Sequence, residues 1–238
     1  MKIKFWGVRG SIPVPGPQTV KYGGNTSCIE VQGANGEQIV LDAGTGIRLL
    51  GLDILKRGTP HPKIDLFISH THWDHIQGFP FFAPCYVPSV ELNVKGPIHF
   101  VDKESLQNVF DLQMQYEFFP ISNQQLGAKI DYHSLKESNL DVGNINVRTQ
   151  FMNHPILCLG YKLTENGKTF VYTGDHEPYH NVFSEEKKED AEDDNLFGNL
   201  DGTVNAANER FVDFIRKADV LVVDCQYTPE EYRTSRRN

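Results

Sequence analysis

The stretch His70-Thr71-His72-Trp73-Asp74-His75 places three imidazoles and one carboxylate within six consecutive residues. The residues just before it, 64–69, are mostly apolar and are bounded by turn-forming residues, which predicts a short buried strand. Because side chains alternate along a strand, the first two imidazoles are expected on one face, and a turn would bring the carboxylate and third imidazole toward them. Zinc and similar divalent ions prefer such ligands. The stretch therefore predicts a metal site at a strand end, whereas a lone histidine here would be interpreted as an ordinary surface residue.

The composition predicts a single cytoplasmic domain over residues 1–238. The chain is 39% hydrophobic and has 15 phenylalanines, enough for a sizeable core. No apolar run approaches the length of a membrane span, and the first residues lack the pattern of a signal peptide. The cysteines are scattered without C-x-x-C spacing, which predicts reduced and mostly buried thiols at Cys28, Cys85, Cys158 and Cys225.

The net charge of −8 argues against a protein that holds nucleic acid by broad neutralisation of phosphates. Much of this charge comes from one run, 185–194, which has seven acidic residues and two lysines. We expect a mobile acidic loop over 184–200, since such a run favours solvent over a packed core.

Strand and helix patterns interleave along the rest of the chain. Helices are predicted at 47–57, 104–115 and 207–217, and strands at 3–5, 28–31, 38–41, 92–95, 145–151 and 218–224. The dipeptide Asn166-Gly167 predicts a hairpin between 159–163 and 169–172. This order predicts an α/β protein with a mixed sheet and outer helices. Residues 7–25 form a long glycine- and proline-rich connection, of a kind that is usually functional or disordered.

Four motifs, each at the end of a predicted strand, together resemble the metallo-β-lactamase-fold hydrolases over nearly the whole chain. They are Asp42-Ala43-Gly44-Thr45-Gly46, the stretch 70–75, His154 and Asp175. The segments 7–13 (GVRGSIP) and 22–27 (YGGNTS) are more similar to the phosphodiesterase and tRNA-3′-processing branch than to the lactamases. The resemblance implies a four-layer αβ/βα sandwich with mixed sheets.

The resemblance also implies a site for two divalent ions. The implied ligands are His70, His72 and His154 for the first ion, Asp74 and His75 for the second, and Asp175 as a bridge. Zinc is the expected metal, with manganese or iron as alternatives. Two such ions can lower the pKa of a shared water and polarise a phosphoryl oxygen, and Asp74 would also act as a catalytic residue that orients the hydroxide.

Three further residues are candidates for the site. Asn25, in the glycine-rich connection, and His176, next to the bridging carboxylate, are predicted to contact the substrate, although His176 could equally be a surface histidine. Asp224 ends a strand where tRNA-processing relatives carry a glutamate that orients a catalytic histidine, so a catalytic role is expected for it. A turn or cap aspartate is the alternative for Asp224.

The chain departs from the family pattern after Asp224. The pattern needs two more histidines there, one as a proton donor and one as a ligand of the second ion, whereas 225–238 contain none. A final strand and helix are also expected to be absent, and the second ion to be held weakly. Three interpretations stay open: a phosphodiesterase whose missing ligand is replaced by water or by a partner chain, a metal-binding remnant, and a truncated hydrolase.

The substrate expected from these features is a small phosphodiester such as a cyclic nucleotide. The segment between His75 and His154 lacks a glycine-rich basic arm that would clamp tRNA, so nucleic acid is the less favoured partner. The alternatives are a tRNA 3′-processing endoribonuclease-like nuclease and an ester or thioester hydrolase. No membrane partner is expected, and a homodimer is possible.

Overall fold

The computed structural model describes residues 1–97, 105–181, 200–228 and 230–231. The acidic loop expected over 184–200 lies, except for Leu200, outside these residues. The described part is a mixed α/β structure with two sheets and helices, as predicted. No helix in it is long and apolar enough to cross a membrane.

The two sheets contain six and five strands. In spatial order the larger sheet consists of β1 (Lys2–Gly7), β2 (Cys28–Gln32), β3 (Gln38–Leu41), β4 (Lys63–Phe67), β5 (Glu91–Pro97) and β6 (Lys129–Leu135). The smaller sheet consists of β11 (Val220–Val222), β10 (Lys168–Tyr172), β9 (Cys158–Glu165), β8 (Ile145–Met152) and β7 (Asn139–Val142). Strands β3 to β6 are parallel, and the smaller sheet is antiparallel except for the parallel pair β10 and β11.

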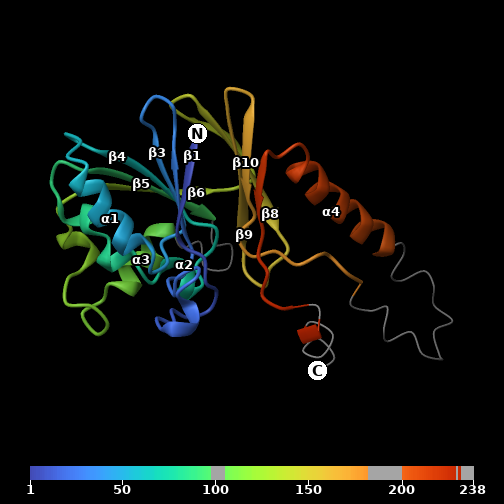
Figure 1. Cartoon of the computed structure of the whole chain (residues 1–238), viewed down its shortest axis with the longest axis horizontal. Helices are drawn as coiled ribbons and strands as arrows, with labels where there is room; N and C mark the ends of the chain where they lie inside the picture. The colour runs from blue at the N-terminus through green and yellow to red at the C-terminus, as the bar shows by residue number, and fades with distance from the viewer. Residues whose placement is uncertain (98–104, 182–199, 229, 232–238) are drawn as a thin grey trace.

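The helices lie outside the sheets, as Figure 1 shows. They are α1 (Ile47–Lys56), α2 (Trp73–Ile76), α3 (Leu106–Gln113) and α4 (Leu200–Ile215), with short 3-10 turns at Pro17–Thr19, Phe79–Phe81, Ala83–Tyr86 and Asn123–Gln125. Helices α1 and α3 follow strands of the larger sheet and connect parallel neighbours, while α4 covers the smaller sheet. Parallel strands need such crossovers because a tight hairpin cannot join them.

Three apolar clusters separate four layers of secondary structure. Alternation along the strands produces them: Val40 and Leu66 face α1 and α3, whereas Leu41 and Phe67 face the other sheet. The third cluster lies between the smaller sheet and α4, around Phe214. The four-layer αβ/βα sandwich that the sequence resembles is therefore confirmed.

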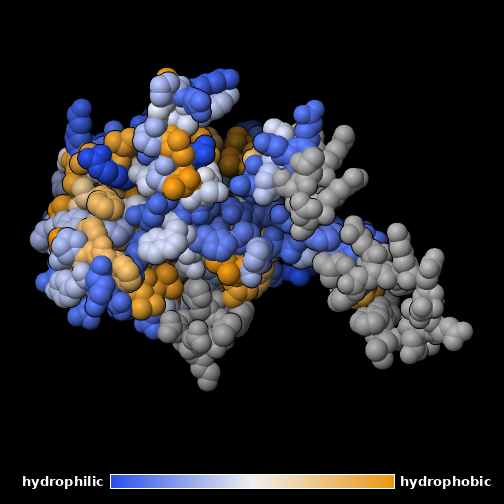
Figure 2. All heavy atoms as spheres, turned by 90° about the horizontal axis from the view of Figure 1, so that it is seen from below, coloured by the Kyte–Doolittle hydropathy of each residue, from blue (hydrophilic) through white to orange (hydrophobic). Residues whose placement is uncertain are grey.

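The sheet register brings four strand ends to one edge of the sandwich. Leu41 pairs with Phe67, so β3 and β4 end side by side. Strands β8 and β10 both run antiparallel to β9 and therefore end in the same direction. Figure 2 views the molecule from below Figure 1, from the side on which α2 lies, and shows hydrophilic surface with separate hydrophobic patches around it.

Some local predictions were wrong. The last helix already includes Leu200 and does not start at residue 207, because Leu200, Val204 and Ala207 extend its partly buried face by two turns. Strands β6 and β7 were not predicted, although β6 alternates polar and apolar residues. The strand predicted at 218–224 is only three residues long, and Val220 and Leu221 are exposed because β11 is an edge strand among the described residues.

Phe214 provides a test of the outer layer, because it is fully buried on α4 against Met152, Cys158 and Val171. We expect Phe214→Ala to lower the free energy of unfolding by about 3–5 kcal/mol through lost burial and the resulting cavity. Val212→Ala on the exposed side of the same helix should change it by about 0.5 kcal/mol or less. Urea denaturation measures both, and equal effects would mean that α4 does not pack on the sheet as described.

Candidate metal centre

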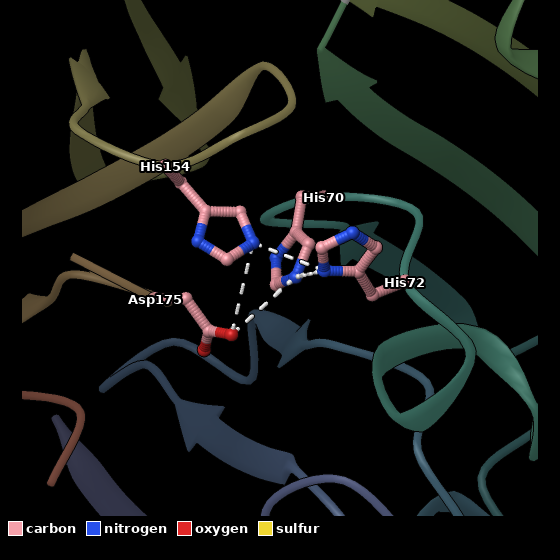
Figure 3. Close-up of side chains that lie close together, drawn as sticks. All are labelled: His70, His72, His154 and Asp175. Atoms are coloured by element: carbon pink, nitrogen blue, oxygen red, sulfur yellow. Dashed lines mark hydrogen bonds and ion pairs between the residues drawn. The ribbon is translucent and has the colours of Figure 1, made fainter. Parts of the chain in front are cut away.

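Three histidines and one aspartate from three different segments meet at this edge. Nδ1 of His72 lies 3.1 Å from Nε2 of His70 and 3.0 Å from Nε2 of His154. Oδ2 of Asp175 lies 3.6 Å from the same nitrogen of His70 and 3.9 Å from that of His154. Figure 3 shows the four side chains pointing toward a common centre. The structure therefore brings together the three residues expected at the first ion and the expected bridge.

The spacing of these atoms fits a metal ion. Ligand atoms about 2.1 Å from a tetrahedral ion lie about 3.4 Å from one another. The four distances given above are 3.0 to 3.9 Å, and all of the ligand atoms lie within 4.8 Å of one another. Burial, aided by the neighbouring His75, lowers the pKa of His70 to about 2, so its ring is neutral and its nitrogen is free to bind a cation. The donor set of three imidazoles and a carboxylate is one that zinc accepts.

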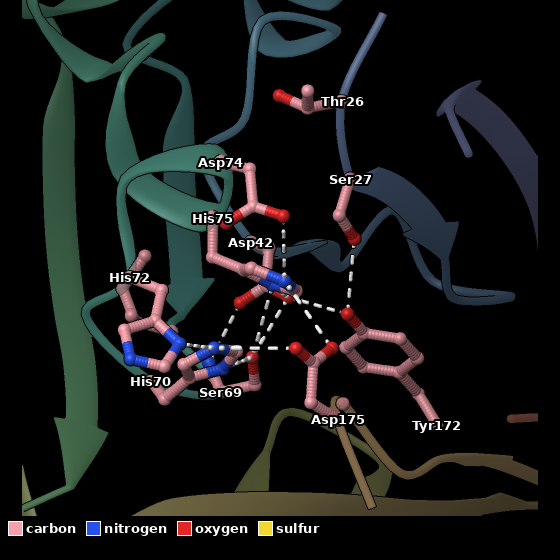
Figure 4. Close-up of polar contacts among 12 residues, drawn as sticks. Thr26, Ser27, Asp42, Ser69, His70, His72, Asp74, His75, Tyr172 and Asp175 are labelled. Carbon is pink, nitrogen blue, oxygen red and sulfur yellow. Dashed lines mark hydrogen bonds and ion pairs between the residues drawn. The ribbon is translucent and has the colours of Figure 1, made fainter. Parts of the chain in front are cut away.

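A second group of donors lies next to the first. Nε2 of His75 is 3.6 Å from Oδ2 of Asp74 and 3.3 Å from Oδ1 of Asp175. Asp175 thus presents one oxygen to each group, as Figure 4 shows. Burial opposes ionisation of Asp175, but the contacts with His75 prevail and lower its pKa to about 2.

Asp42 orients this second group from behind. Its carboxylate accepts hydrogen bonds from the backbone N–H and hydroxyl of Ser69, at 2.6 and 2.9 Å, and from the hydroxyl of Tyr172. Oδ2 also lies 2.7 Å from Nδ1 of His75, which directs the other ring nitrogen toward Asp74 and Asp175. Burial disfavours the charge on His75, but Asp42 and Asp175 together raise its pKa well above the usual value.

The sequence did not predict that Asp42 orients His75, because it indicated only that the motif beginning at Asp42 ends a strand. One signal was available: a fully buried aspartate at the end of β3 needs hydrogen-bond partners, and the neighbouring strand end supplies them. Its φ of 61° lies in the left-handed region, which is uncommon for a residue other than glycine.

Asp74 is positioned by the loop that follows β1. It lies in the first turn of α2, and its Oδ2 accepts the backbone N–H of Ser11 at 2.7 Å. Ser11 has a φ of 67°, a strained conformation of the kind that concentrates at functional sites. The N–H of Ser11 is thus bonded to a candidate metal ligand.

Asn25 and His176 make structural contacts beside the centre. Oδ1 of Asn25 accepts the hydroxyl of Thr45, and its carbonyl accepts the N–H groups of Val8 and Arg9. Nδ1 of His176 accepts the N–H of Asn153. Its ring stacks on Phe211. Burial lowers the pKa of His176 to about 4. Substrate contact by Asn25 and by His176 stays a prediction.

Asp224 lies on the wall of a cleft that opens beside the second group. The cleft has a volume of about 470 Å³ and is lined by the loop 7–11, by residues 222–226, and by His75 and Asp175. Loss of hydration in the cleft and the nearby charge of Asp175 raise the pKa of Asp224. The catalytic role expected for Asp224 stays a prediction, but the structure places it at the same cleft as the candidate ligands.

Replacing one histidine tests the first ion. We expect His154→Ala to reduce bound zinc by about one ion per chain after dialysis, since it removes one of three imidazole donors. Exposed His180 is the matched control, and His180→Ala should keep the wild-type content. Metal analysis of the purified proteins measures this, and an unchanged content in His154→Ala would contradict the assignment.

Asp42→Asn tests the orienting role at the second group. The substitution keeps the size of the side chain but removes the charge that holds His75, so the affinity for the second ion should fall about 10- to 100-fold. Titration against a chelating dye measures it. Asp65→Asn is the control, because Asp65 is another buried aspartate, paired with Lys95 on the neighbouring strand. Equal affinities in wild type and Asp42→Asn would rule out this role.

Comparison with known proteins places the chain in a family. The model of the beta-lactamase superfamily domain matches residues 37–192, more than half of the chain. A ribonuclease Z from Lactococcus lactis subsp. cremoris is 27% identical over 116 residues, which cover 46% of this chain but only 34% of that protein. The chain thus spans about a third of the length of this curated relative.

Solved structures show the same fold. Human tRNase Z, short form, aligns over 100% of this chain and 83% of its own, with 16% identity and a TM-score of 0.61. A metallo-beta-lactamase fold protein from Bacillus subtilis aligns over 96% of this chain and 73% of its own, with 17% identity and a TM-score of 0.56. The chain therefore belongs to the beta-lactamase superfamily, and its fold is that of the metallo-β-lactamases.

Proposed function

We propose that this chain is a metal-dependent phosphodiesterase that hydrolyses a small phosphodiester, such as a cyclic nucleotide. The observation that carries the proposal is the pair of adjacent donor groups that share Asp175. His70, His72 and His154 would hold one ion, and Asp74 and His75 the other, with zinc the expected metal. When bound, such a pair of ions lowers the pKa of water and polarises a phosphoryl oxygen.

Two acidic residues of the chain would orient the reacting groups. Oδ2 of Asp74 accepts a hydrogen bond from the backbone N–H of Ser11 and also faces Nε2 of His75 in the second group of donors. We infer that this carboxylate orients the attacking oxygen. Asp224 is proposed as a positioning residue, because it lines the cleft that the second group borders.

The cleft supports a small substrate. Its volume of about 470 Å³ lies within the range of about 300–1,000 Å³ that is usual for pockets that bind small molecules. The net charge of −8 disfavours long contacts with a polyanion.

A tRNA 3′-processing endoribonuclease-like nuclease is the second candidate. It is favoured by the relatives that the chain matches, which are named ribonuclease Z and ribonuclease BN. The two candidates share the same centre and differ in what the surrounding surface binds.

A substrate panel distinguishes the candidates. The zinc- or manganese-loaded chain should hydrolyse bis(p-nitrophenyl) phosphate and a cyclic nucleotide, and should cleave precursor tRNA and a lactam more slowly. Asp74→Ala should reduce diester hydrolysis about 10²–10⁴-fold, the usual contribution of a residue that assists removal of a proton from the nucleophile.

Glu209→Ala, on the exposed surface of α4, is the matched control and should retain wild-type rates. Circular dichroism of each variant separates loss of chemistry from loss of fold. Efficient cleavage of precursor tRNA with little activity on small diesters would favour the ribonuclease, and wild-type activity in Asp74→Ala would contradict the assigned mechanism.

A further inference from the structure

One cationic side chain borders the cleft beside the candidate metal centre. Arg9 is the only arginine or lysine among its lining residues, which also include the acids Asp175 and Asp224. Arg9 makes no ion pair within the parts of the chain that the structure describes. Its positive charge is therefore not used by the neighbouring carboxylates.

The guanidinium of Arg9 is held in place through one edge. Its Nε donates a hydrogen bond to the carbonyl of Ile12 at 2.9 Å, and its backbone N–H donates to the carbonyl of Asn25 at 3.0 Å. The two terminal nitrogens carry four N–H donors that can form a fork matching the oxygens of a phosphate group.

The loop that carries Arg9 is fixed to the metal centre. Ser11, two residues on, donates its N–H to Asp74 at 2.7 Å. At the start of the loop, a Cβ on Gly7 would lie 1.8 Å from the carbonyl oxygen of Thr26. The backbone at Gly7 therefore approaches the backbone at Thr26 too closely for any residue larger than glycine at position 7. Arg9 is therefore preorganised next to the second donor group, and is not itself a candidate metal ligand.

The opposite wall of the cleft comes close to this loop. A Cβ on Gly10 would lie 3.4 Å from Oε1 of Gln226, so the segment after β11 faces the Arg9 loop across the cleft. A group bound at Arg9 would be enclosed by these two segments while the metal centre holds a neighbouring group.

The geometry points to an anion subsite in which Arg9 binds a phosphate of the substrate other than the scissile one. The inference rests on the proposed function, since it supposes that a phosphodiester occupies the metal centre. The preferred substrate is then a phosphodiester that carries an additional phosphomonoester group close to the scissile bond. Two charge-assisted hydrogen bonds to that group supply the preference.

The test compares two chromogenic substrates that differ in one phosphate: thymidine 5′-(p-nitrophenyl phosphate) and its 3′-phosphorylated form. For the wild type, the 3′-phosphate should lower KM. In Arg9→Ala, the ratio of kcat/KM between the two substrates should fall about 10- to 100-fold, the effect of losing hydrogen bonds to a charged group. Arg9→Lys should retain part of the preference, because it keeps the charge without the fork.

Arg48→Ala is the matched control. Arg48 is exposed on α1 and does not line the cleft, so its removal changes the net charge equally and should leave the ratio unchanged. If Arg9→Ala slows both substrates by the same factor, Arg9 only supports the loop and the subsite is refuted.

A binding measurement separates this inference from the proposed function. In calorimetric titration, thymidine 3′,5′-bisphosphate should bind the zinc-loaded wild type. Its affinity for zinc-loaded Arg9→Ala should be about 10- to 100-fold lower. Weaker binding to Arg9→Ala with no hydrolysis of either substrate by the wild type would support the subsite and refute the phosphodiesterase. Equal binding to both proteins would refute the subsite.

Discussion

The buried carboxylate of Asp42 is the contact on which the arrangement of the centre depends. It joins the end of β4 through Ser69, the start of α2 through His75, and the smaller sheet through Tyr172. A buried carboxylate is costly unless its oxygens are satisfied by donors. The two sheets therefore meet at this edge in an arrangement that supplies hydrogen-bond donors to the Asp42 carboxylate. The same arrangement directs His75 toward Asp74 and Asp175.

The layers around this contact follow from simple patterning. Alternating apolar residues in β3 and β4 fill both the central core and the outer core under α1 and α3. Such alternation can be recognised in a sequence, and so can the motifs at the strand ends. The two mixed sheets and the outer helices were therefore predictable, together with the grouping of His70, His72, His154 and Asp175 that the family resemblance implies.

Other features could not be predicted, because they depend on contacts between distant segments. The N-terminal loop meets the metal centre through a backbone N–H of Ser11, and any residue but proline could provide that donor. The edge position of β11 among the described strands depends on which strands pair, so its apolar sequence did not predict that Val220 and Leu221 are exposed. The packing of His176 on Phe211 joins residues on either side of a long stretch outside the described structure.

Within the part of the chain that the structure describes, β11 is an edge strand, and this position connects assembly of the protein with access to the cleft. An edge strand presents unpaired N–H and C=O groups on which another strand can add. Residues 222–226, which begin in β11 and continue past its end, form one wall of the cleft beside the metal centre. A strand added there would lie against that wall, so assembly at this edge and entry of a ligand into the cleft would influence each other.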